Sequence, residues 1–232
     1  MNAASPPCVL LCHDVEIFAL LQFKESFIFN RSASYAPFAY SKVSLWMMWS
    51  NDCSTWDGVE CDENICHVVS LDLSNSSLYV SINSSSSLFQ LVHLQKLNLA
   101  YNFNHSKSPI GVGWLSKLAH LNLSCSGFWG EILAEILQLP KLVSLDLYSN
   151  PLTLHKLGLE SIAEKLTNLE ELVPSGVDIS STVPSILANL SSLTTILLKN
   201  CGLHGQFPTG IFQLPNLKTL NMHFNLNLMT RI

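Results

Sequence analysis

The feature that most restricts the fold of this chain is a leucine triplet, L-x-x-L-x-x-L, which occurs six times. The first residues of the triplets are Leu91, Leu115, Leu139, Leu166, Leu190 and Leu214. The steps between them are 24, 24, 27, 24 and 24 residues. A nearly constant step of this length indicates a repeat architecture, in which each repeat forms one coil of a stack.

The last residue of most triplets begins an alternating pair, L-x-L, which is typical of a short strand with one buried face. These pairs are Leu71/Leu73, Leu97/Leu99, Leu121/Leu123, Leu145/Leu147, Ile196/Leu198 and Leu220/Met222, and the first of them adds a repeat before the six triplets. Five positions after a pair begins, the sequence has Asn102, Asn150, Cys201 and Asn225. We expect these side chains to turn inward and bond backbone groups as the chain leaves the strand.

The predicted fold class is therefore an α/β-type solenoid, a leucine-rich-repeat right-handed superhelix with short parallel strands on its concave face. Residues 67–232 hold about seven repeats of about 24 residues, the last one incomplete. The 27-residue step contains His155–Lys165, for which we expect a short helix on the convex side. Pro174 follows the strand that begins at Leu172, and it should weaken the hydrogen-bond ladder there because proline has no N–H.

Charge and hydropathy argue against a nucleic-acid partner and against a membrane-spanning segment. The net charge is -5, and only 12 Lys and Arg residues are spread thinly along the chain, so we expect no nucleic-acid partner. Apolar runs fall far short of the ~18 residues needed to cross a bilayer, so we expect no membrane segment.

Seven cysteines, five of them in the first 66 residues, favour an oxidising compartment. Six Asn-x-Ser sequons support secretion and predict glycosylation at Asn30, Asn75, Asn83, Asn104, Asn122 and Asn189. Residues 1–11 lack the basic and apolar regions of a signal peptide. We interpret them as a degenerate or missing signal region; a cytosolic chain with reduced thiols is the alternative.

Several motifs carry a resemblance to a known family. They are Asp14–Phe23 (DVEIFALLQF), Asn51–Cys61 (NDCSTWDGVEC), Val68–Ser74 (VVSLDLS) and Cys201–Gly205 (CGLHG). Together they resemble plant leucine-rich-repeat receptor-like proteins of the disease-resistance type, over residues 12–228. The resemblance implies a helical, disulfide-bonded N-terminal cap at residues 12–66, and an ectodomain of a plasma-membrane receptor at the cell surface.

The cap also has a physical logic of its own. Val15, Phe18, Ala19, Leu21 and Phe23 suit an amphipathic helix that begins near Asp14. With Trp46, Trp49 and Trp56, this helix would cover the first coil, because terminal repeats need capping.

The resemblance implies a bridge between Cys12 and Cys53. Ser54 stands where the family has a second cysteine, which leaves Cys61 without its usual partner. A compensating Cys61–Cys66 bridge is one possibility, and the pairing of Cys8, Cys61 and Cys66 stays open.

Reactive or metal-binding constellations are hard to find. The segments Cys8–His13 and Cys61–His67 invite a zinc interpretation, but zinc sites usually show two tight ligand pairs, so we expect no metal. The chain has no G-x-S-x-G elbow, H-E-x-x-H motif or phosphate loop, so we expect neither catalysis nor a cofactor. The eight histidines are interpreted as scattered surface or groove residues.

The concave strand faces are the candidate binding surface. Their outward positions are Lys96, Asn98, Tyr101, His120, Asn122, Asp146, Tyr148, Lys199, Asn221 and His223. Such a mixture suits a peptide, glycan or protein ligand, with a co-receptor ectodomain as a further partner. Any solenoid must place polar residues there, so each single assignment is a hypothesis.

The predicted function is that of an extracellular ligand-binding ectodomain fragment in plant defence or developmental signalling. Two alternatives are a secreted inhibitor of cell-wall-degrading enzymes, similar to polygalacturonase inhibitors, and a truncated paralogue without function. The sequence ends partway through a coil, so we expect its last strand, with Leu220 and Met222, to be an uncovered and aggregation-prone edge.

Overall fold

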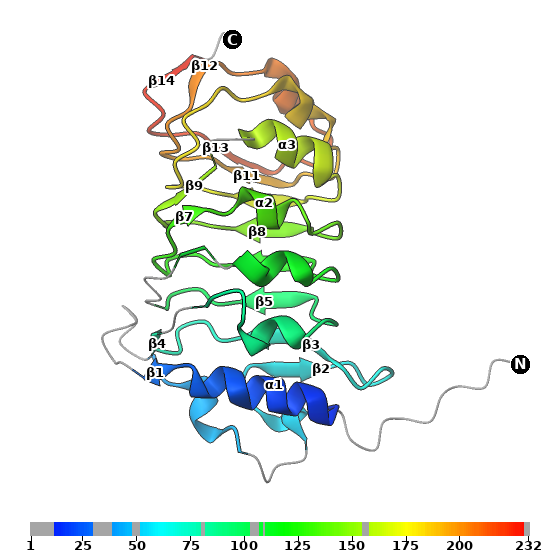
Figure 1. The fold of residues 1–232 in the computed structure, drawn as a ribbon. Coiled ribbons are helices and arrows are strands. Elements are labelled where there is room, and N and C mark those ends of the chain that lie inside the picture. Colours follow the sequence, from blue (N-terminus) through cyan, green and yellow to red (C-terminus); the bar gives the residue numbers. More distant parts are fainter. Residues whose placement is uncertain are drawn as a thin grey trace, which may run out of the picture.

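The computed structural model of the chain describes residues 12–29, 39–47, 52–79, 82–102, 107–108, 110–154 and 158–229. Successive coils stack into one elongated body, and the cap helix lies across its N-terminal end (Figure 1). Each coil contributes a strand to one face and a helical segment to the opposite face.

One eight-stranded sheet runs the length of the stack, in the order β2-β3-β5-β6-β8-β10-β11-β13. Its strands are β2 (Val59–Cys61), β3 (Val68–Asp72), β5 (Lys96–Asn98), β6 (His120–Asn122), β8 (Ser144–Asp146), β10 (Glu171–Val173), β11 (Thr195–Leu197) and β13 (Thr219–Asn221). The strand β2 is antiparallel to β3, and every other pairing is parallel. The leucine pairs therefore form parallel strands in one sheet, as predicted.

Short helical segments cover the other side of the core. They are η4 (Ser87–Gln90), η5 (Ile110–Trp114), α2 (Leu133–Ile136), α3 (Gly158–Lys165), η6 (Ser185–Asn189) and η7 (Thr209–Gln213). The helix predicted in the 27-residue step is α3; residues 155–157 lie outside the described part of the chain. The segments η4, η5 and α2 pack on one another in that order, and so do α3, η6 and η7.

Three two-stranded sheets form between the main sheet and the helical side. The pairs are β1 (Ile28–Phe29) with β4 (Leu78–Tyr79), β7 (Gly130–Glu131) with β9 (Leu152–Thr153), and β12 (His204–Gln206) with β14 (Asn227–Met229).

The core is a continuous leucine column lined by buried amides. Leu121, Leu145 and Leu172 are at most 1% exposed. The amide of Asn150 accepts hydrogen bonds from two backbone N–H groups of the preceding coil and donates to three carbonyls, including that of Leu123 at 2.7 Å. Asn102 and Asn225 bond their neighbouring coils in the same way, so the predicted inward position after each strand is confirmed at these three residues.

The third residue after each strand of the main sheet from β3 to β13 lies in the left-handed region, a feature that the leucine pattern does not reveal. These residues, with φ between 51° and 84°, are Asn75, Tyr101, Cys125, Ser149, Gly176, Asn200 and Phe224. The first six donate their N–H to a carbonyl of the following coil, so the turn continues the inter-coil ladder beyond the strand.

Pro174 interrupts this ladder, as predicted. In other coils, the residue after the strand donates its N–H to the last residue of the next strand, as Leu147 does to the carbonyl of Val173 at 3.0 Å. Pro174 has no N–H to donate in the corresponding place. The pairing of β10 with β11 accordingly spans two residue pairs, against three for β10 with β8.

The cap begins with α1 (Asp14–Glu25) and continues through η2 (Lys42–Leu45) and η3 (Cys53–Thr55). The helix forms where predicted, but the face assigned to it was partly wrong. Val15 and Phe18 are 67% and 61% exposed, whereas Ile17, Leu20 and Phe23 are buried. These three recur at a spacing of three residues, and that stripe is the one packed on the core.

Two tryptophans complete the apolar part of the cap. Trp46 and Trp56 are buried, with ring centroids 5.5 Å apart in a stacked arrangement. Trp49, the third tryptophan assigned to this role, lies outside the described residues.

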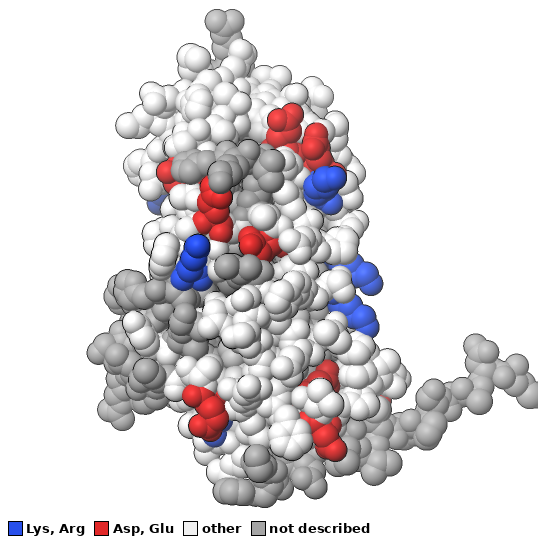
Figure 2. Space-filling view, in the orientation of Figure 1, with Lys and Arg blue, Asp and Glu red and all other residues white. Residues whose placement is uncertain are grey.

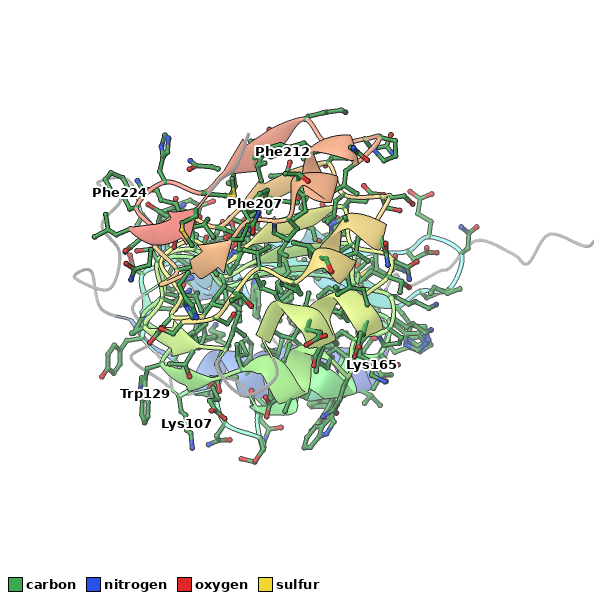
Figure 3. The ribbon with its side chains drawn as sticks, turned by 90° about the horizontal axis from the view of Figure 1, so that it is seen from above. Lys107, Trp129, Lys165, Phe207, Phe212 and Phe224 are labelled. Atoms are coloured by element: carbon green, nitrogen blue, oxygen red, sulfur yellow. A yellow bond between two sulfur atoms is a disulfide. The ribbon has the colours of Figure 1, made fainter. Side chains whose placement is uncertain are left out.

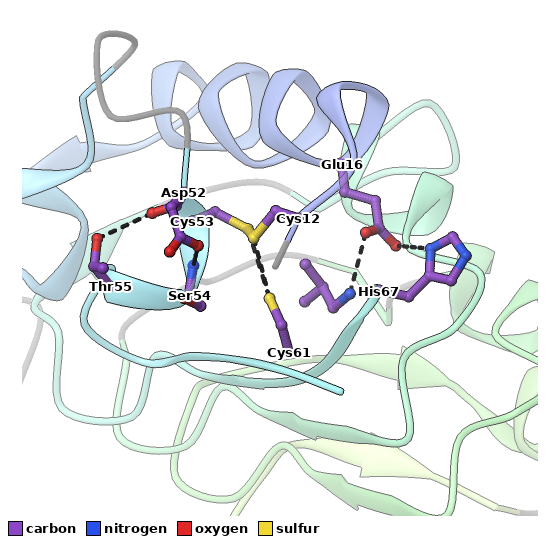
Figure 4. Close-up of a disulfide and its surroundings, with 9 residues drawn as sticks. Cys12, Glu16, Asp52, Cys53, Ser54, Thr55, Cys61 and His67 are labelled. Atoms are coloured by element: carbon purple, nitrogen blue, oxygen red, sulfur yellow. Dashed lines mark hydrogen bonds and ion pairs between the residues drawn. A yellow bond between two sulfur atoms is a disulfide. The ribbon is translucent and has the colours of Figure 1, made fainter. Parts of the chain in front are cut away.

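The cysteines of the cap pair in part as expected. Cys12 and Cys53 form a disulfide (Figure 4). Cys66 is also disulfide-bonded, but Cys61 is a free thiol, so the suggested Cys61–Cys66 bridge is wrong. The Cys61 side chain lies against the existing bridge, with its Sγ 3.1 Å from Cys12 Sγ and 3.8 Å from Cys53 Sγ. Cys8 lies outside the described residues.

Within the described part of the chain, no helix has the length and apolar character that a bilayer crossing requires.

Candidate ligand-binding surface on the concave sheet

The parallel register arranges the outward side chains of the sheet in two rows. The first row holds the residue with which the parallel pairing of each strand begins. These residues are Ser70, Lys96, His120, Ser144, Glu171, Thr195 and Thr219. The second row includes Asp72, Asn98, Asn122 and Asp146, and continues at Val173, Leu197 and Asn221. The buried core leucines lie between the two rows.

The two rows differ in how free their side chains are. In the first row, Lys96, His120 and Glu171 are exposed. In the second row, Asn98 and Asp146 are half-buried, and each side-chain oxygen accepts a hydrogen bond from the backbone N–H two residues later, at 3.1 and 2.9 Å. The predicted second-row residues therefore stabilise the turn that follows their strand, and they present only their remaining polar atoms to a ligand.

Asn221 repeats this arrangement in β13, where its side-chain oxygen accepts a hydrogen bond from the N–H of His223 at 3.0 Å. Asn98 also contacts its neighbour in the second row, because its amide donates a 3.2 Å hydrogen bond to the carboxylate of Asp72.

The remaining predicted residues lie just beyond the strands. Tyr101, Tyr148 and His223 are exposed, and Lys199 is half-buried. The ammonium of Lys199 lies 5.1 Å from the ring centroid of Phe224. Phe224 projects at the outer rim of the last coil, whereas Phe207 points toward its interior (Figure 3).

A shallow groove of about 310 Å³ connects the two rows across β3, β5, β6, β8 and β10. It brings together the predicted Lys96, Asn98, His120 and Asp146. Tyr148 and Lys199 line a separate pocket, and Asn221 and His223 line a third at β13, the last strand of the main sheet.

Sequence reasoning missed one acidic residue of the surface, Glu171, and the effect of its charge on the predicted Asp146. Glu171 lies in the groove, and its carboxylate accepts a 2.6 Å hydrogen bond from Ser144. Burial raises the pKa of Asp146, and the charge of nearby Glu171 raises it further. The middle of the groove is therefore an acidic site in which two carboxylates share a small volume. The two-residue alternation of the strands could have placed Glu171 in register with His120.

A salt bridge marks the N-terminal end of the surface. Lys42 reaches from the cap to Asp72, with 2.9 Å between Nζ and Oδ1. Burial alone raises the pKa of Asp72, but hydrogen bonds from Ser74 and Lys42 outweigh it, so this pKa lies below its ordinary value.

The sequons occupy different environments. Asn83 and Asn189 are exposed, and Asn75 is half-buried. Asn122 is half-buried in the groove, and its oxygen accepts hydrogen bonds from the N–H and hydroxyl of Ser124 at 2.9 and 2.7 Å. Asn30 and Asn104 lie outside the described residues.

The histidines are less scattered than the sequence suggested. His13, His67 and His93 come from separate parts of the chain and stack on one another beside Glu16. On the helical face shown in Figure 2, by contrast, basic and acidic residues are dispersed and form no continuous patch.

The chain is similar in sequence to plant receptor-like proteins. It is 39% identical over 238 residues to Receptor-like protein 6 of Arabidopsis thaliana, covering 94% of the chain and 23% of that protein. It is 41% identical over 234 residues to Receptor-like protein Cf-9 of Solanum pimpinellifolium, covering 95% of the chain and 26% of that protein. The chain thus spans about a quarter of the length of these relatives. No protein-family model matches it.

Solved structures agree on the fold. Pollen Receptor Kinase 3 matches with a TM-score of 0.73 and 24% identity, covering 90% of the chain and 94% of that structure. The ectodomain of the Arabidopsis receptor kinase HAESA, in complex with a peptide hormone ligand, matches with a TM-score of 0.67 and 25% identity, covering 92% of the chain and 37% of that structure.

The alignments to relatives at about 40% identity cover nearly the whole chain. The sheet, the cap and the Cys12–Cys53 bridge agree with the ectodomain fold. Receptor-like proteins are a non-catalytic family. The chain is a leucine-rich-repeat region of the plant receptor-like protein family.

Proposed function

We propose that this region is an extracellular binding module that recognises a peptide along its concave face, within a receptor of plant defence. Cf-9 is among the relatives, and the HAESA ectodomain carries a peptide hormone in its complex. PEPR1 in complex with AtPEP1, another fold neighbour, matches with a TM-score of 0.61 and 25% identity, covering 94% of the chain and 34% of that structure. A co-receptor ectodomain is a further partner in this proposal.

The acidic middle of the groove carries the proposal. Asp146 and Glu171 lie in the same groove, and burial with like charge raises the pKa of Asp146. A cationic group between the two carboxylates would relieve their repulsion and replace the water lost on burial. The preferred ligand is therefore a peptide with Lys or Arg at the position that meets this pair.

Two basic side chains that flank the acidic pair would orient the ligand. Lys96 and His120 are exposed on the strands that precede the acidic pair. They suit an acidic residue or a chain-terminal carboxylate on the N-terminal side of the groove. A ligand with separated positive and negative groups would thus bind in one orientation only.

The module works outside the cell in this proposal, because the cap depends on a disulfide that an oxidising compartment maintains. Exposed Asn83 and Asn189 are available to glycosylation without covering the groove. The signalling role of the whole receptor is part of the proposal.

The test is selection from a displayed random-peptide library against the purified chain. We expect enriched peptides to contain Lys or Arg, and the Asp146→Asn/Glu171→Gln variant to bind them at least 10-fold more weakly, about 1.4 kcal/mol. Both substitutions keep an oxygen acceptor for the bonds from Tyr148 N–H and the Ser144 hydroxyl.

Glu164→Gln, an exposed carboxylate on α3, is the matched control and should leave affinity unchanged. Selected peptides that bind equally to the wild-type chain and the double variant would contradict the assignment of the acidic groove.

A further inference from the structure

Three imidazoles and one buried carboxylate meet where the cap joins the first coils. His13 precedes α1, Glu16 lies in its first turn, His67 precedes β3, and His93 lies in the loop before β5. The ring centroids of His13 and His67 are 4.2 Å apart, and those of His67 and His93 are 3.5 Å apart. None of these residues lines the concave groove.

Glu16 anchors the cluster. It is only 5% exposed, although it lies near the start of a surface helix. One carboxylate oxygen lies 3.2 Å from His67 Nδ1, and the other accepts the N–H of Val68 at 3.1 Å (Figure 4). A carboxylate is tolerated at such burial when it is hydrogen-bonded, paired with a cation or bound to a metal ion.

His93 supplies an unsatisfied nitrogen. Its Nδ1 is buried and has no hydrogen-bond partner, whereas buried polar atoms nearly always have one. A ring nitrogen without a hydrogen-bond partner is an available ligand atom for a metal ion, because neutral imidazole coordinates through such a nitrogen.

The ligand atoms of Glu16, His67 and His93 all lie within 4.8 Å of one another. A zinc ion about 2 Å from each ligand would hold them at roughly 3.5 Å, so the contraction required is small. We propose that Glu16, His67 and His93 form a binding site for a divalent transition-metal ion that ties the cap helix to the first two coils.

The donor set defines the class of ion. Two imidazoles and a carboxylate suit Zn²⁺, Cu²⁺ or Ni²⁺, whereas Ca²⁺ and Mg²⁺ require mainly oxygen ligands. The stacked rings of His67 and His93 are inclined by 19°, so their lone pairs run nearly side by side. One ring must turn for both nitrogens to face the same ion, and half-buried His93, with its unpartnered Nδ1, is the ring that turns.

The test uses the full chain without a histidine tag and with its disulfides intact. Addition of Co²⁺ should produce a visible absorption band that saturates at one equivalent and disappears on addition of Zn²⁺. His93→Gln should lower the affinity at least 10-fold, because it removes an imidazole ligand.

Two control variants separate this site from others. His204→Gln changes an exposed histidine on β12 and should leave the titration unchanged. Cys61→Ser should also leave it unchanged, which excludes the sulfur cluster of the cap as the Co²⁺ ligand. A titration that shows no saturable band, or one that is identical in His93→Gln, would overturn the proposal.

A measurement without substitutions keeps the inference testable if His93→Gln does not fold. Zn²⁺ should protect His67 and His93, but not His204, from modification by diethyl pyrocarbonate, as read by peptide mass spectrometry. Equal modification of all three with and without Zn²⁺ would equally overturn the site. Peptide binding on the concave face is independent of either result.

Discussion

The cap and the coils of this molecule are stabilised in different ways. In the coils, the same contacts recur: an inward leucine, an amide that bonds the neighbouring coil and a left-handed residue after the strand. In the cap, each contact is made once, as in the Cys12–Cys53 bridge and the bonds of Glu16 to the first coil. Repetition distributes stability along the coils, whereas the cap depends on a few contacts between residues distant in sequence.

The largest expected effect is in the middle of the coils. Leu145→Ala removes a fully buried side chain from β8 and should lower the free energy of unfolding by about 3–5 kcal/mol, measured by urea denaturation. Leu226→Ala is the control, because that leucine is 94% exposed. A loss below about 1 kcal/mol for Leu145→Ala would show that the coils do not share one core.

The second-largest effect is expected when the disulfide of the cap is removed. The Cys53→Ser/Cys61→Ser variant removes the bridge and should cost about 3–4 kcal/mol, because the bridge closes a loop over a sequence separation of 41 residues. Cys53→Ser alone should cost less, because Cys61 Sγ lies 3.1 Å from Cys12 Sγ and can take over the bridge.

Disulfide mapping and thermal unfolding of the two variants check this prediction. Equal losses in both, with Cys12 unpaired in the single variant, would contradict the takeover. Burial and then the charges of Glu16 and Asp52 raise the pKa of the Cys61 thiol to about 12. In the unmodified chain, Cys61 is therefore protonated at neutral pH and a poor nucleophile toward the neighbouring bridge.

The amide ladder should give an intermediate effect. Asn150→Ala leaves two N–H donors and one carbonyl of the preceding coil, and two carbonyls of its own coil, without their partner, and it should cost about 2–3 kcal/mol. Asn168→Ala, which loses one exposed hydrogen bond to Pro140, should change stability by less than about 0.5 kcal/mol. Hydrogen exchange should show a loss of protection in the preceding coil, where the N–H groups of Ser126 and Phe128 lose their acceptor, and unchanged protection there would argue against a ladder that joins the two coils.

The smallest predicted effect concerns the acidic groove. The raised pKa of Asp146 means that the folded chain binds this proton more tightly than the unfolded chain. The ionised carboxylate therefore destabilises the fold at neutral pH, and this penalty disappears as pH falls through the raised pKa toward the ordinary value of about 4. Asp146→Asn should stabilise the chain by about 0.5 kcal/mol at pH 7 and by nothing below pH ~4, measured by thermal unfolding across pH. A stabilisation independent of pH would show that charge is not its cause.

The same division explains what the sequence could predict. The strands and the inward position of Asn102, Asn150 and Asn225 follow from a spacing that is repeated many times, so chance agreement is excluded. The stack of His13, His67 and His93 depends on how the cap folds back on the coils, and no periodicity encodes that.

The concave surface could be predicted only in part from the sequence. The register predicts which residues face outward, but not how much freedom each side chain keeps. Asn98 and Asp146 both face the groove, and only the structure shows that each is partly engaged by its own turn. The outward positions that keep most freedom, such as Lys96 and Glu171, precede the buried leucine instead of following it.

The missing N–H of Pro174 has a mechanical consequence. Force applied along a stack passes through every interface in series, so the interface with the fewest hydrogen bonds separates first. The junction of β10 and β11 has lost one bond that the comparable junctions keep. Under tension, the main sheet should therefore open first between β10 and β11, while the turns beyond the strands, where Gly176 and Ile179 donate to the carbonyls of Lys199 and Cys201, still hold the two coils together.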